Sequence, residues 1–352
     1  MDNNYDHTLY LPFLKKKKIL KKTSKNEKEF LFNIAKNYLY SGFLLNSLEF
    51  DEYSLDLKNK LTNLNKNYLF QNTLINKISN SITKELDENN INYVLMKGVA
   101  LKKGGFYLNN ERQFRDLDIL IEEKKIEKVY EILKKMGFKY IYKNISDSCK
   151  YYKYTNHLPE MQNELKTTVE VHYRVTDPKI YKLCPLTNSF FLNKRKVEKQ
   201  FIPSINDMVL HAFYHGIVHH DYKHGPIFLL DILRLTEKNY NCFKNIEQRM
   251  DYLGLKDELK SVKKISSLVF SKQDNENKIL LELESFFKFS YWNKRTNKHS
   301  LNDKFFKLKK IKSNIANSLE HTRYKHQTGY ITFKFIYFYF IKIIDNLYRF
   351  RM

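Results

Sequence analysis

Apolar residues recur at helical spacing from the start of the chain to about residue 90. The pattern is clearest in Glu27–Leu48 and Asn67–Leu86, where few glycine or proline residues interrupt it. Such spacing places the apolar side chains on one face of a helix, because 3.6 residues make one turn. We therefore expect an N-terminal helical arm at residues 1–88.

Short apolar runs replace the helical pattern between residues 89 and 176. Runs of this length predict strands, and they are Asn92–Met96, Phe114–Ile121, Phe138–Tyr142 and Thr167–Val175. Between them, Glu123–Met136 has helical periodicity and stops at Gly137, a residue type common directly after a helix. The expected fold class is α+β, with a small mixed-sheet core flanked by helical regions on both sides.

Helical periodicity returns after Ser204, in a C-terminal region that we place at residues 177–352. Asn206 or Asp207 is the expected N-cap of a helix that runs through His211 and His215.

The most apolar stretch is Tyr330–Tyr348, which Lys334, Lys342 and Asp345 interrupt. Its uninterrupted part, Phe335–Ile341, is shorter than the roughly 20 residues that a membrane-spanning helix needs. We expect no transmembrane span. A buried terminal helix is favoured, and a helix lying on a membrane surface is the alternative.

The charge balance is strongly basic, with 62 Lys and Arg against 39 Asp and Glu and a net charge of +23. Only 10 of the 62 basic residues are Arg, the residue best suited to nucleic-acid recognition, and no compact basic-aromatic motif appears. Nucleic acid is therefore not the favoured partner. A hydrophobic content of 42% with 15% aromatic residues is enough for a core and excludes a disordered chain.

Two features favour the reducing cytoplasm as the location. Cys149, Cys184 and Cys242 lack the close spacing of a zinc site or a redox pair. The basic residues Lys15–Lys18 are not followed by the apolar run of a signal peptide.

Two carboxylates lie on the second predicted strand. Side chains alternate faces along a strand, so Asp116 and Asp118 project from one face while Leu117 and Ile119 turn to the core. Such a pair suits Mg²⁺, which prefers oxygen ligands. One Asp-x-Asp is expected by chance in this chain, and a strand end that faces water is the alternative.

A third carboxylate lies on the last predicted strand, where alternation puts Glu170, His172 and Arg174 on one face. A half-exposed strand whose polar face meets water is the alternative. Upstream, Lys97-Gly98 follows the first strand and precedes a short helical segment, and a glycine at such a turn lets backbone N–H groups approach a phosphate. The turn and the three carboxylates together describe a metal-dependent site for nucleotidyl transfer.

These segments resemble the uncharacterised bacterial nucleotidyltransferase family of the polymerase-β-like superfamily. The resemblance rests on VLMKGVAL (Val94–Leu101), GFYLNNERQFRDLDILI (Gly105–Ile121), VYEILKKMGFKY (Val129–Tyr140) and VEVHYRV (Val169–Val175). Three further matches extend it over most of the chain, and they are FNIAKNYLYSGFLLNSL (Phe32–Leu48), HAFYHGIVHH (His211–His220) and Asp231. Two positions depart from the pattern: Met96 replaces a leucine of the family, and Val99 replaces the serine that follows the turn glycine in the wider superfamily.

The resemblance implies a nucleotidyltransferase core that moves a nucleoside monophosphate from an NTP to an acceptor and releases pyrophosphate. It assigns Mg²⁺, with Mn²⁺ as the alternative ion, to Asp116, Asp118 and Glu170. It also implies two further groups: nucleotide-binding residues, which are Lys97, Gly98 and Arg112, and acceptor or accessory residues, which are His172, Arg174, His215 and Asp231.

Three histidines repeat every fourth residue in the C-terminal region, and they are His211, His215 and His219. Two histidines at this spacing can share a zinc ion on one face of a helix. Zinc helices of this kind usually carry a glutamate between the histidines, and none stands here. The favoured interpretation is that the helix closes the active-site cleft or packs against the core, with zinc as the alternative.

Three functions stay open at this point: an active nucleotidyltransferase, a catalytically silent nucleotide-binding or scaffold protein, and an RNA-binding or RNA-modifying member of the same fold. The set of three carboxylates favours the first. The acceptor is not readable from the sequence, since a sugar phosphate, a small metabolite, a peptide or a protein all fit. A peripheral membrane contact is also left open.

Overall fold

The computed structural model describes residues 10–14, 18–20, 24–107, 111–141, 156–176, 185–220, 222, 225–237, 239–271 and 275–287. The chain separates into two units, Met1–Phe286 and Phe287–Met352. The apolar stretch Tyr330–Tyr348 lies outside the described residues, so its expected burial or membrane contact stays a prediction. Within the described part, no helix is both long enough and apolar enough to cross a bilayer.

Helices form in both N-terminal stretches where the apolar spacing predicts them. They are α1 (Lys25–Asn37), α2 (Ser41–Ser47) and the 34-residue α3 (Leu55–Glu88). A capping box begins α1, because the Ser24 hydroxyl accepts from the Glu27 N–H while the Glu27 carboxylate accepts from the Ser24 N–H. A short parallel pair, β1 (Lys18–Leu20) with β2 (Leu48–Phe50), was not expected.

A mixed five-stranded sheet forms the centre of the first unit. In the order of the sheet its strands are β3 (Tyr93–Leu95), β4 (Asp116–Ile121), β7 (Thr168–His172), β6 (Met161–Gln162) and β5 (Lys139–Tyr140). The pair β4–β7 is parallel, and the other pairs are antiparallel. All four predicted runs form strands, and the α+β class is confirmed.

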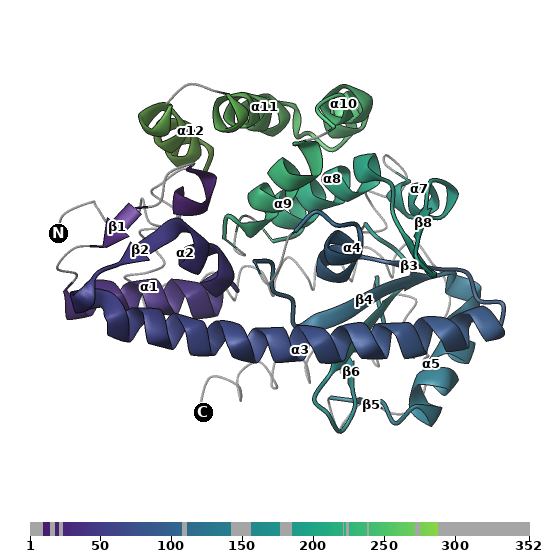
Figure 1. Cartoon of the computed structure of the whole chain (residues 1–352). Helices are drawn as coiled ribbons and strands as arrows, with labels where there is room; N and C mark the ends of the chain where they lie inside the picture. Colours follow the sequence, from purple (N-terminus) through teal and green to yellow (C-terminus); the bar gives the residue numbers. More distant parts are fainter. Residues whose placement is uncertain are drawn as a thin grey trace, which may run out of the picture. The chain divides into compact units, whose positions relative to one another are not determined.

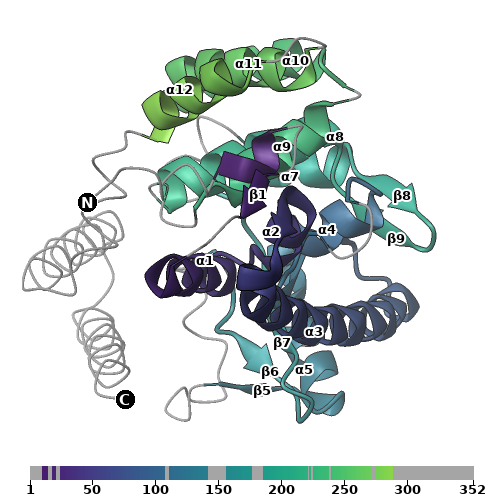
Figure 2. The same cartoon turned by 60° about the vertical axis from the view of Figure 1, so that its left-hand side comes forward.

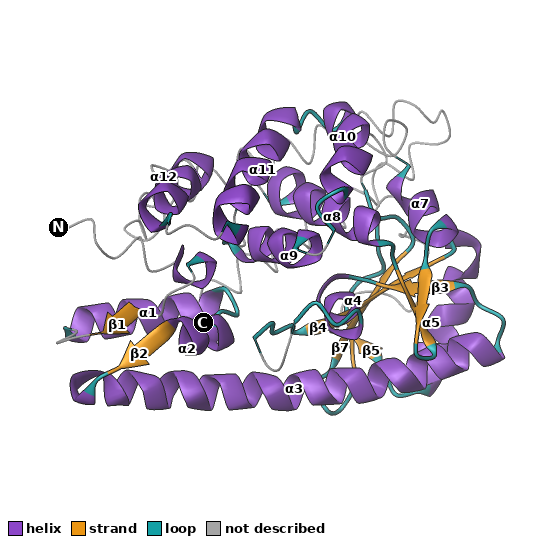
Figure 3. Ribbon diagram, turned by 45° about the horizontal axis from the view of Figure 1, so that its top comes forward, coloured by secondary structure: helices purple, strands orange, loops and turns teal. Residues whose placement is uncertain are grey.

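Helices cover the sheet. The long helix α3 runs along β4, and α5 (Ile126–Lys135) packs beside it (Figures 1 and 3). The end of α5 is the one predicted from the sequence, since Gly137 follows with φ +86°, a left-handed conformation that favours glycine. On the other side lies α4 (Lys97–Lys103), with α8 (Ile205–Phe213) and α9 (Ile227–Thr236) beyond it (Figure 2).

The rest of the first unit is helical apart from one hairpin, β8 (Arg195–Val197) with β9 (Gln200–Ile202), which was not expected. The remaining helices are α7 (Leu186–Leu192), α10 (Cys242–Tyr252), α11 (Lys256–Phe270) and α12 (Glu276–Phe287). The division of the chain at residues 88 and 176 stays a prediction.

The expected N-cap of α8 was wrong. Ser204 is the cap, and its hydroxyl accepts from the Asp207 N–H. Asp207 lies inside the first turn, where its buried carboxylate accepts hydrogen bonds from Ser189 at 2.5 Å, from Ser204 at 2.7 Å and from Arg249 at 2.9 Å. These three donors compensate the buried charge of Asp207, which a position at the helix cap would leave with fewer partners.

A buried ion pair ties the segment before β4 to α9. Arg112 donates to Asp231 through Nε at 2.9 Å and through Nη2 at 3.1 Å, and the Tyr107 hydroxyl donates to the same carboxylate at 2.7 Å. The side chains of Arg112 and Asp231 are only 12% and 9% exposed. Two parallel N–H···O bonds fix orientation as well as charge, so the contact holds the core and the C-terminal helices in one geometry.

We expect Asp231→Asn to lower the free energy of unfolding by about 3 kcal/mol or more, because it leaves the Arg112 guanidinium buried without its counter-charge. Urea denaturation followed by circular dichroism measures this loss. The matched control is Glu237→Gln, which removes an exposed partner of Arg234 at 3.6 Å and should change stability by less than about 1 kcal/mol. If the double variant Arg112→Met, Asp231→Leu is no more stable than Asp231→Asn, the unpaired charge is not the cause.

Candidate active site

The parallel pairing of β4 and β7 sets the positions of the candidate carboxylates. In the register of these strands Asp118 stands opposite Glu170 and Asp116 stands opposite Thr168. Side chains of paired residues in neighbouring strands project from the same face of the sheet. Glu170 therefore lies beside Asp118, on the face that the sequence pattern assigns to both.

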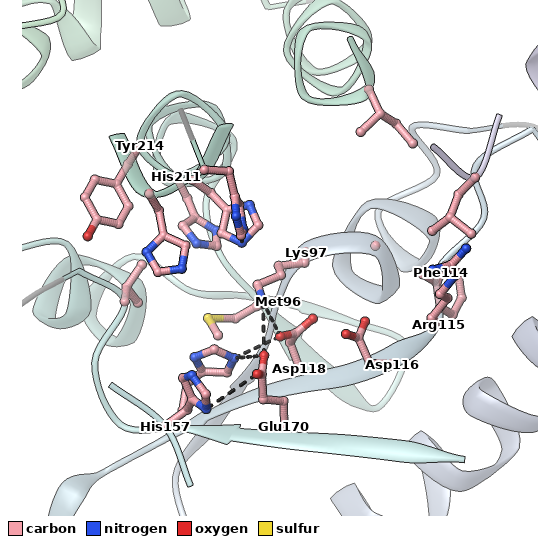
Figure 4. Close-up of a pocket in the computed structure, with 18 of the residues that line it drawn as sticks. Met96, Lys97, Phe114, Arg115, Asp116, Asp118, His157, Glu170, His211 and Tyr214 are labelled. Atoms are coloured by element: carbon pink, nitrogen blue, oxygen red, sulfur yellow. Dashed lines mark hydrogen bonds and ion pairs between the residues drawn. The ribbon is translucent and has the colours of Figure 1, made fainter. Parts of the chain in front are cut away.

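Lys97 lies against these two carboxylates (Figure 4), and His172 contacts the same pair. The Lys97 Nζ lies 2.5 Å from Asp118 Oδ1 and 3.2 Å from Glu170 Oε2. The His172 Nε2 lies 2.8 Å and 3.0 Å from the same two oxygens. Asp118 is almost fully buried at 2% exposed, so its charge depends on these partners rather than on water.

The pKa shifts follow from this arrangement. Burial opposes the charge of Lys97, but the nearby carboxylates of Asp118 and Glu170 outweigh it, and the pKa of Lys97 lies above its ordinary value. Burial alone would raise the pKa of Glu170, yet the hydrogen bond from His172 and the neighbouring positive charges hold that pKa well below its usual range. The pKa of His172 is raised, because its hydrogen bonds to the two carboxylates outweigh burial and the Lys97 charge.

Asp116 differs from the other carboxylates. It is half-buried, and within the described residues no hydrogen bond or ion pair reaches its side chain. Burial, together with the charge of Asp118, raises the pKa of Asp116 to about 7. A carboxylate that is crowded by like charge and lacks a donor is available to a cation from outside the protein.

The Lys97-Gly98 turn has a different geometry from the one expected. The left-handed residue is Lys97, with φ +50°, and Gly98 is buried in the first turn of α4. A Cβ on Gly98 would stand 2.6 Å from the Cβ of Phe114, so glycine is required for close packing against the segment that leads into β4. The turn places the Lys97 ammonium over the carboxylates.

A pocket of about 470 Å³ opens over this network. Its lining includes Asp116, Asp118, Glu170 and His172 from the sheet, Arg115 from the lead-in to β4 and the histidines of the C-terminal region. The pocket is large enough for a nucleotide, since ligand sites typically span roughly 300–1,000 Å³.

The opposite wall of the pocket is built by the histidine helix, which is α8 together with the turn that follows it. His211 and Tyr214 lie there across from Glu170 (Figure 4). After α8 the chain forms a π-helical turn at Tyr214–His219, which brings His215 Nε2 to 3.1 Å from His220 Nε2. Burial lowers the pKa of His211 and His215 well below the ordinary value, so these two rings are neutral at pH 7. His211 and His215 thus line the pocket, and the expected role of this helix in closing an active-site cleft stays a prediction.

Three of the predicted residues stand apart from the carboxylates. Arg112 reaches the pocket lining, but its guanidinium is held by Asp231. Asp231 lines a separate cavity of about 100 Å³ between α4 and the C-terminal helices. Arg174 lies past the end of β7 and pairs with Glu123 at 3.0 Å rather than with the site.

The lining also includes residues that were not predicted to belong to the site, among them His157 and Arg115. His157 lies 3.4 Å from Glu170 Oε1 through Nδ1, and its ring packs 5.1 Å from the ring of His172. Arg115 is exposed beside Asp116 and donates to the Lys36 carbonyl at 2.9 Å. The position of Arg115 next to the Asp-x-Asp pair was a usable signal, whereas His157 stands in a stretch with no periodic pattern.

The donor set fits a divalent cation. Ligand atoms of Asp118, Glu170 and His172 lie within 4.8 Å of one another, the one group of this kind among the residues that the structure describes. The Lys97 ammonium already compensates two of these ligand atoms, the oxygens of Asp118 and Glu170. Asp116 is not in the group, and the histidine helix contributes no member to it.

No curated protein matches the chain at a significant level. Among solved structures, an antigenic nucleotidyltransferase-like protein from Paracoccidioides brasiliensis is similar, with 14% sequence identity and a TM-score of 0.32, over 55% of this chain and 91% of that one. The family described as uncharacterised nucleotidyltransferase matches residues 27–270, a range that contains the whole sheet, the carboxylate pair and the histidine helix. On this match the chain belongs to that family of uncharacterised nucleotidyltransferases.

Proposed function

We propose that this chain is a divalent-metal-dependent nucleotidyltransferase that moves a nucleoside monophosphate from an NTP to an acceptor and releases pyrophosphate. The observation that carries the proposal is the pair Asp118 and Glu170, fixed side by side under a pocket of about 470 Å³. Family membership supports the same reaction class.

Asp118 and Glu170 would hold the cation, with Asp116 at the edge of the same face. Mg²⁺ is the ion expected from carboxylate ligands, and Mn²⁺ is the alternative. When bound, a divalent cation neutralises the phosphate oxygens and activates the acceptor oxygen for in-line attack on the α-phosphate. The carboxylates contribute by being held rigidly on two paired strands, so that little reorganisation is needed.

Lys97 has two roles in this proposal. In the free protein its ammonium compensates Asp118 and Glu170, at 2.5 Å and 3.2 Å. When a cation compensates these carboxylates instead, the ammonium is released toward the pocket, which it lines. There it supplies a point charge for the triphosphate, in place of the hydroxyl that the superfamily turn carries and Val99 lacks.

The acceptor binds, in this proposal, on the side of the pocket formed by the histidine helix. His211 and His215 offer neutral ring nitrogens there, which can donate or accept a hydrogen bond without adding charge. A sugar phosphate, a small metabolite, a peptide and a protein remain the acceptor classes to test.

Binding of nucleotide is tested first with Asp116→Asn, because no partner in the described fold depends on this carboxylate. One NTP together with Mg²⁺ or Mn²⁺ should stabilise the wild-type protein by ~2.7 kcal/mol when the nucleotide is present at 100 times its Kd. A thermal-shift panel of the four NTPs, with and without each ion, measures this. The stabilisation should disappear in Asp116→Asn.

The matched control for that panel is Asp56→Asn, which removes an aspartate paired with Lys28 in the N-terminal arm and should keep the nucleotide response. If no NTP stabilises the wild-type protein with either ion, the enzyme proposal fails and a silent scaffold protein becomes the better interpretation.

Lys97→Met should change two affinities in opposite directions. Removing the ammonium takes away a competitor for Asp118 and Glu170, so Mn²⁺ should bind at least about tenfold more tightly in the absence of nucleotide. The affinity for the NTP should fall, because the phosphate contact is lost. Electron paramagnetic resonance titration of free Mn²⁺ measures the first change, and calorimetry of the metal-loaded protein measures the second.

Lys102→Met is the control for Lys97→Met, since Lys102 belongs to the same helix α4 but makes no contact with the carboxylates. Weaker Mn²⁺ binding in Lys97→Met would contradict the assignment of Lys97 as a competitor.

A further inference from the structure

His172 stands on the same strand as Glu170, two residues further along, and its side chain turns to the same face. Its Nε2 atom lies between two carboxylate oxygens, 2.8 Å from Asp118 Oδ1 and 3.0 Å from Glu170 Oε2. The side chain is only 9% exposed. One ring nitrogen therefore converges with two oxygens at the floor of the pocket.

These separations match a metal coordination shell. Ligands at about 2.1 Å from an octahedral ion stand about 3.0 Å apart when they are neighbours. The two measured N···O separations, 2.8 Å and 3.0 Å, are close to that value. His172 Nε2 is thus placed to neighbour each of the two carboxylate oxygens in the shell of one ion, and all three ligand atoms lie within 4.8 Å of one another.

A simpler interpretation is that His172 is a hydrogen-bond donor that only orients the carboxylates. Against it, the same two oxygens are already paired with the Lys97 ammonium, at 2.5 Å and 3.2 Å. A single N–H is also shared between both oxygens, which leaves each of these hydrogen bonds incomplete. The two donors therefore lie where a metal ion would bind. A bound ion would replace the Lys97 ammonium and the proton on His172 Nε2 at these oxygens.

We propose that His172 is a direct metal ligand and that Asp118, Glu170 and His172 form a one-nitrogen, two-oxygen site that selects a divalent transition-metal ion such as Mn²⁺ or Co²⁺ over Mg²⁺. The inference rests on the proposed function, which places the cation at Asp118 and Glu170. It goes further by adding a ligand and by naming the class of ion.

The selectivity follows from ligand chemistry. Imidazole suits first-row transition metals, whereas carboxylate, carbonyl and water oxygens suit Mg²⁺. Mg²⁺ also gives up its water reluctantly and demands near-ideal geometry, so a nitrogen in its shell is a disadvantage. The neutral His172→Gln variant removes the nitrogen, and His172→Asp converts the set to oxygen alone.

The decisive measurement is pulsed electron paramagnetic resonance of the full-length protein with one equivalent of Mn²⁺, at pH 8 to limit competition by protons. We expect the ¹⁴N modulation of a directly bound imidazole in the wild-type protein. The signal should persist in His157→Gln, the matched control, since His157 also contacts Glu170 and packs against His172. It should vanish in His172→Gln, with at least a tenfold loss of Mn²⁺ affinity.

Competition calorimetry measures selectivity independently of any turnover. The ratio of the Mg²⁺ and Mn²⁺ dissociation constants should move toward Mg²⁺ by tenfold or more in His172→Asp. If His172→Gln does not fold, His172→Asp serves as the variant without the imidazole, and the ¹⁴N signal should be absent from its spectrum.

Three results would overturn the inference. Bound Mn²⁺ without imidazole ¹⁴N modulation would leave the proposed function standing and remove His172 from the ligand set. A signal that survives in His172→Gln, or one that is lost in His157→Gln, would assign the nitrogen to another histidine. Absence of any Mn²⁺ binding to the wild-type protein would overturn both this inference and the metal-dependent function.

Discussion

The site depends on one electrostatic constraint, which is that Asp118 and Glu170 are fixed side by side with little water to separate their charges. Like charges at this range repel strongly in a low-dielectric surrounding, so the pair is stable only beside a positive group. Lys97 and His172 meet this need in the free protein. In the proposed function, a bound cation would compensate the same two charges. The surrounding fold would then have to allow two arrangements, one with Lys97 and one with the cation against the carboxylates.

Several elements of the fold serve that purpose. The parallel register of β4 and β7 holds the two carboxylates on adjacent strands, and the contact of Gly98 with Phe114 brings the start of α4 close enough for Lys97 to reach them. Farther away, the Arg112–Asp231 pair fixes α9, which packs against the histidine-bearing α8, relative to the core. Arg112, which the family resemblance assigns to the nucleotide, thus has a demonstrable partner within the protein. A contact of Arg112 with the nucleotide would have to share the guanidinium with Asp231.

The sequence pattern was sufficient for the α+β class, the four strand segments and the side of each strand on which Asp118 and Glu170 stand, because alternation and helical periodicity are local properties. It was not sufficient for β6, a two-residue strand whose pairing is determined by its neighbours, nor for the β8–β9 hairpin, whose strands have three residues each. The isolated bridge of His157 to His172 brings His157 to the site, and this is a contact between segments that no local pattern encodes. The cap of α8 was misassigned because the Asp207 carboxylate accepts hydrogen bonds from Ser189 and Arg249, which are distant in the sequence. Capping propensity is a local property and does not include such tertiary contacts.

An ion pair such as Lys97–Asp118 is well suited to exchange for a metal. Removing two charges from water costs nearly as much as their mutual attraction returns, so a buried pair contributes little net stability while it persists. Breaking it by deleting one partner is costly, but replacing one cation with another keeps every carboxylate compensated. The free energy that a divalent ion must supply is therefore the difference between two compensated states. It is not the full cost of leaving a buried carboxylate without a partner. In the proposed function the site would thus be fully formed before an ion binds, and the rigid strands would not need to rearrange if Lys97 turned from the carboxylates to the phosphates.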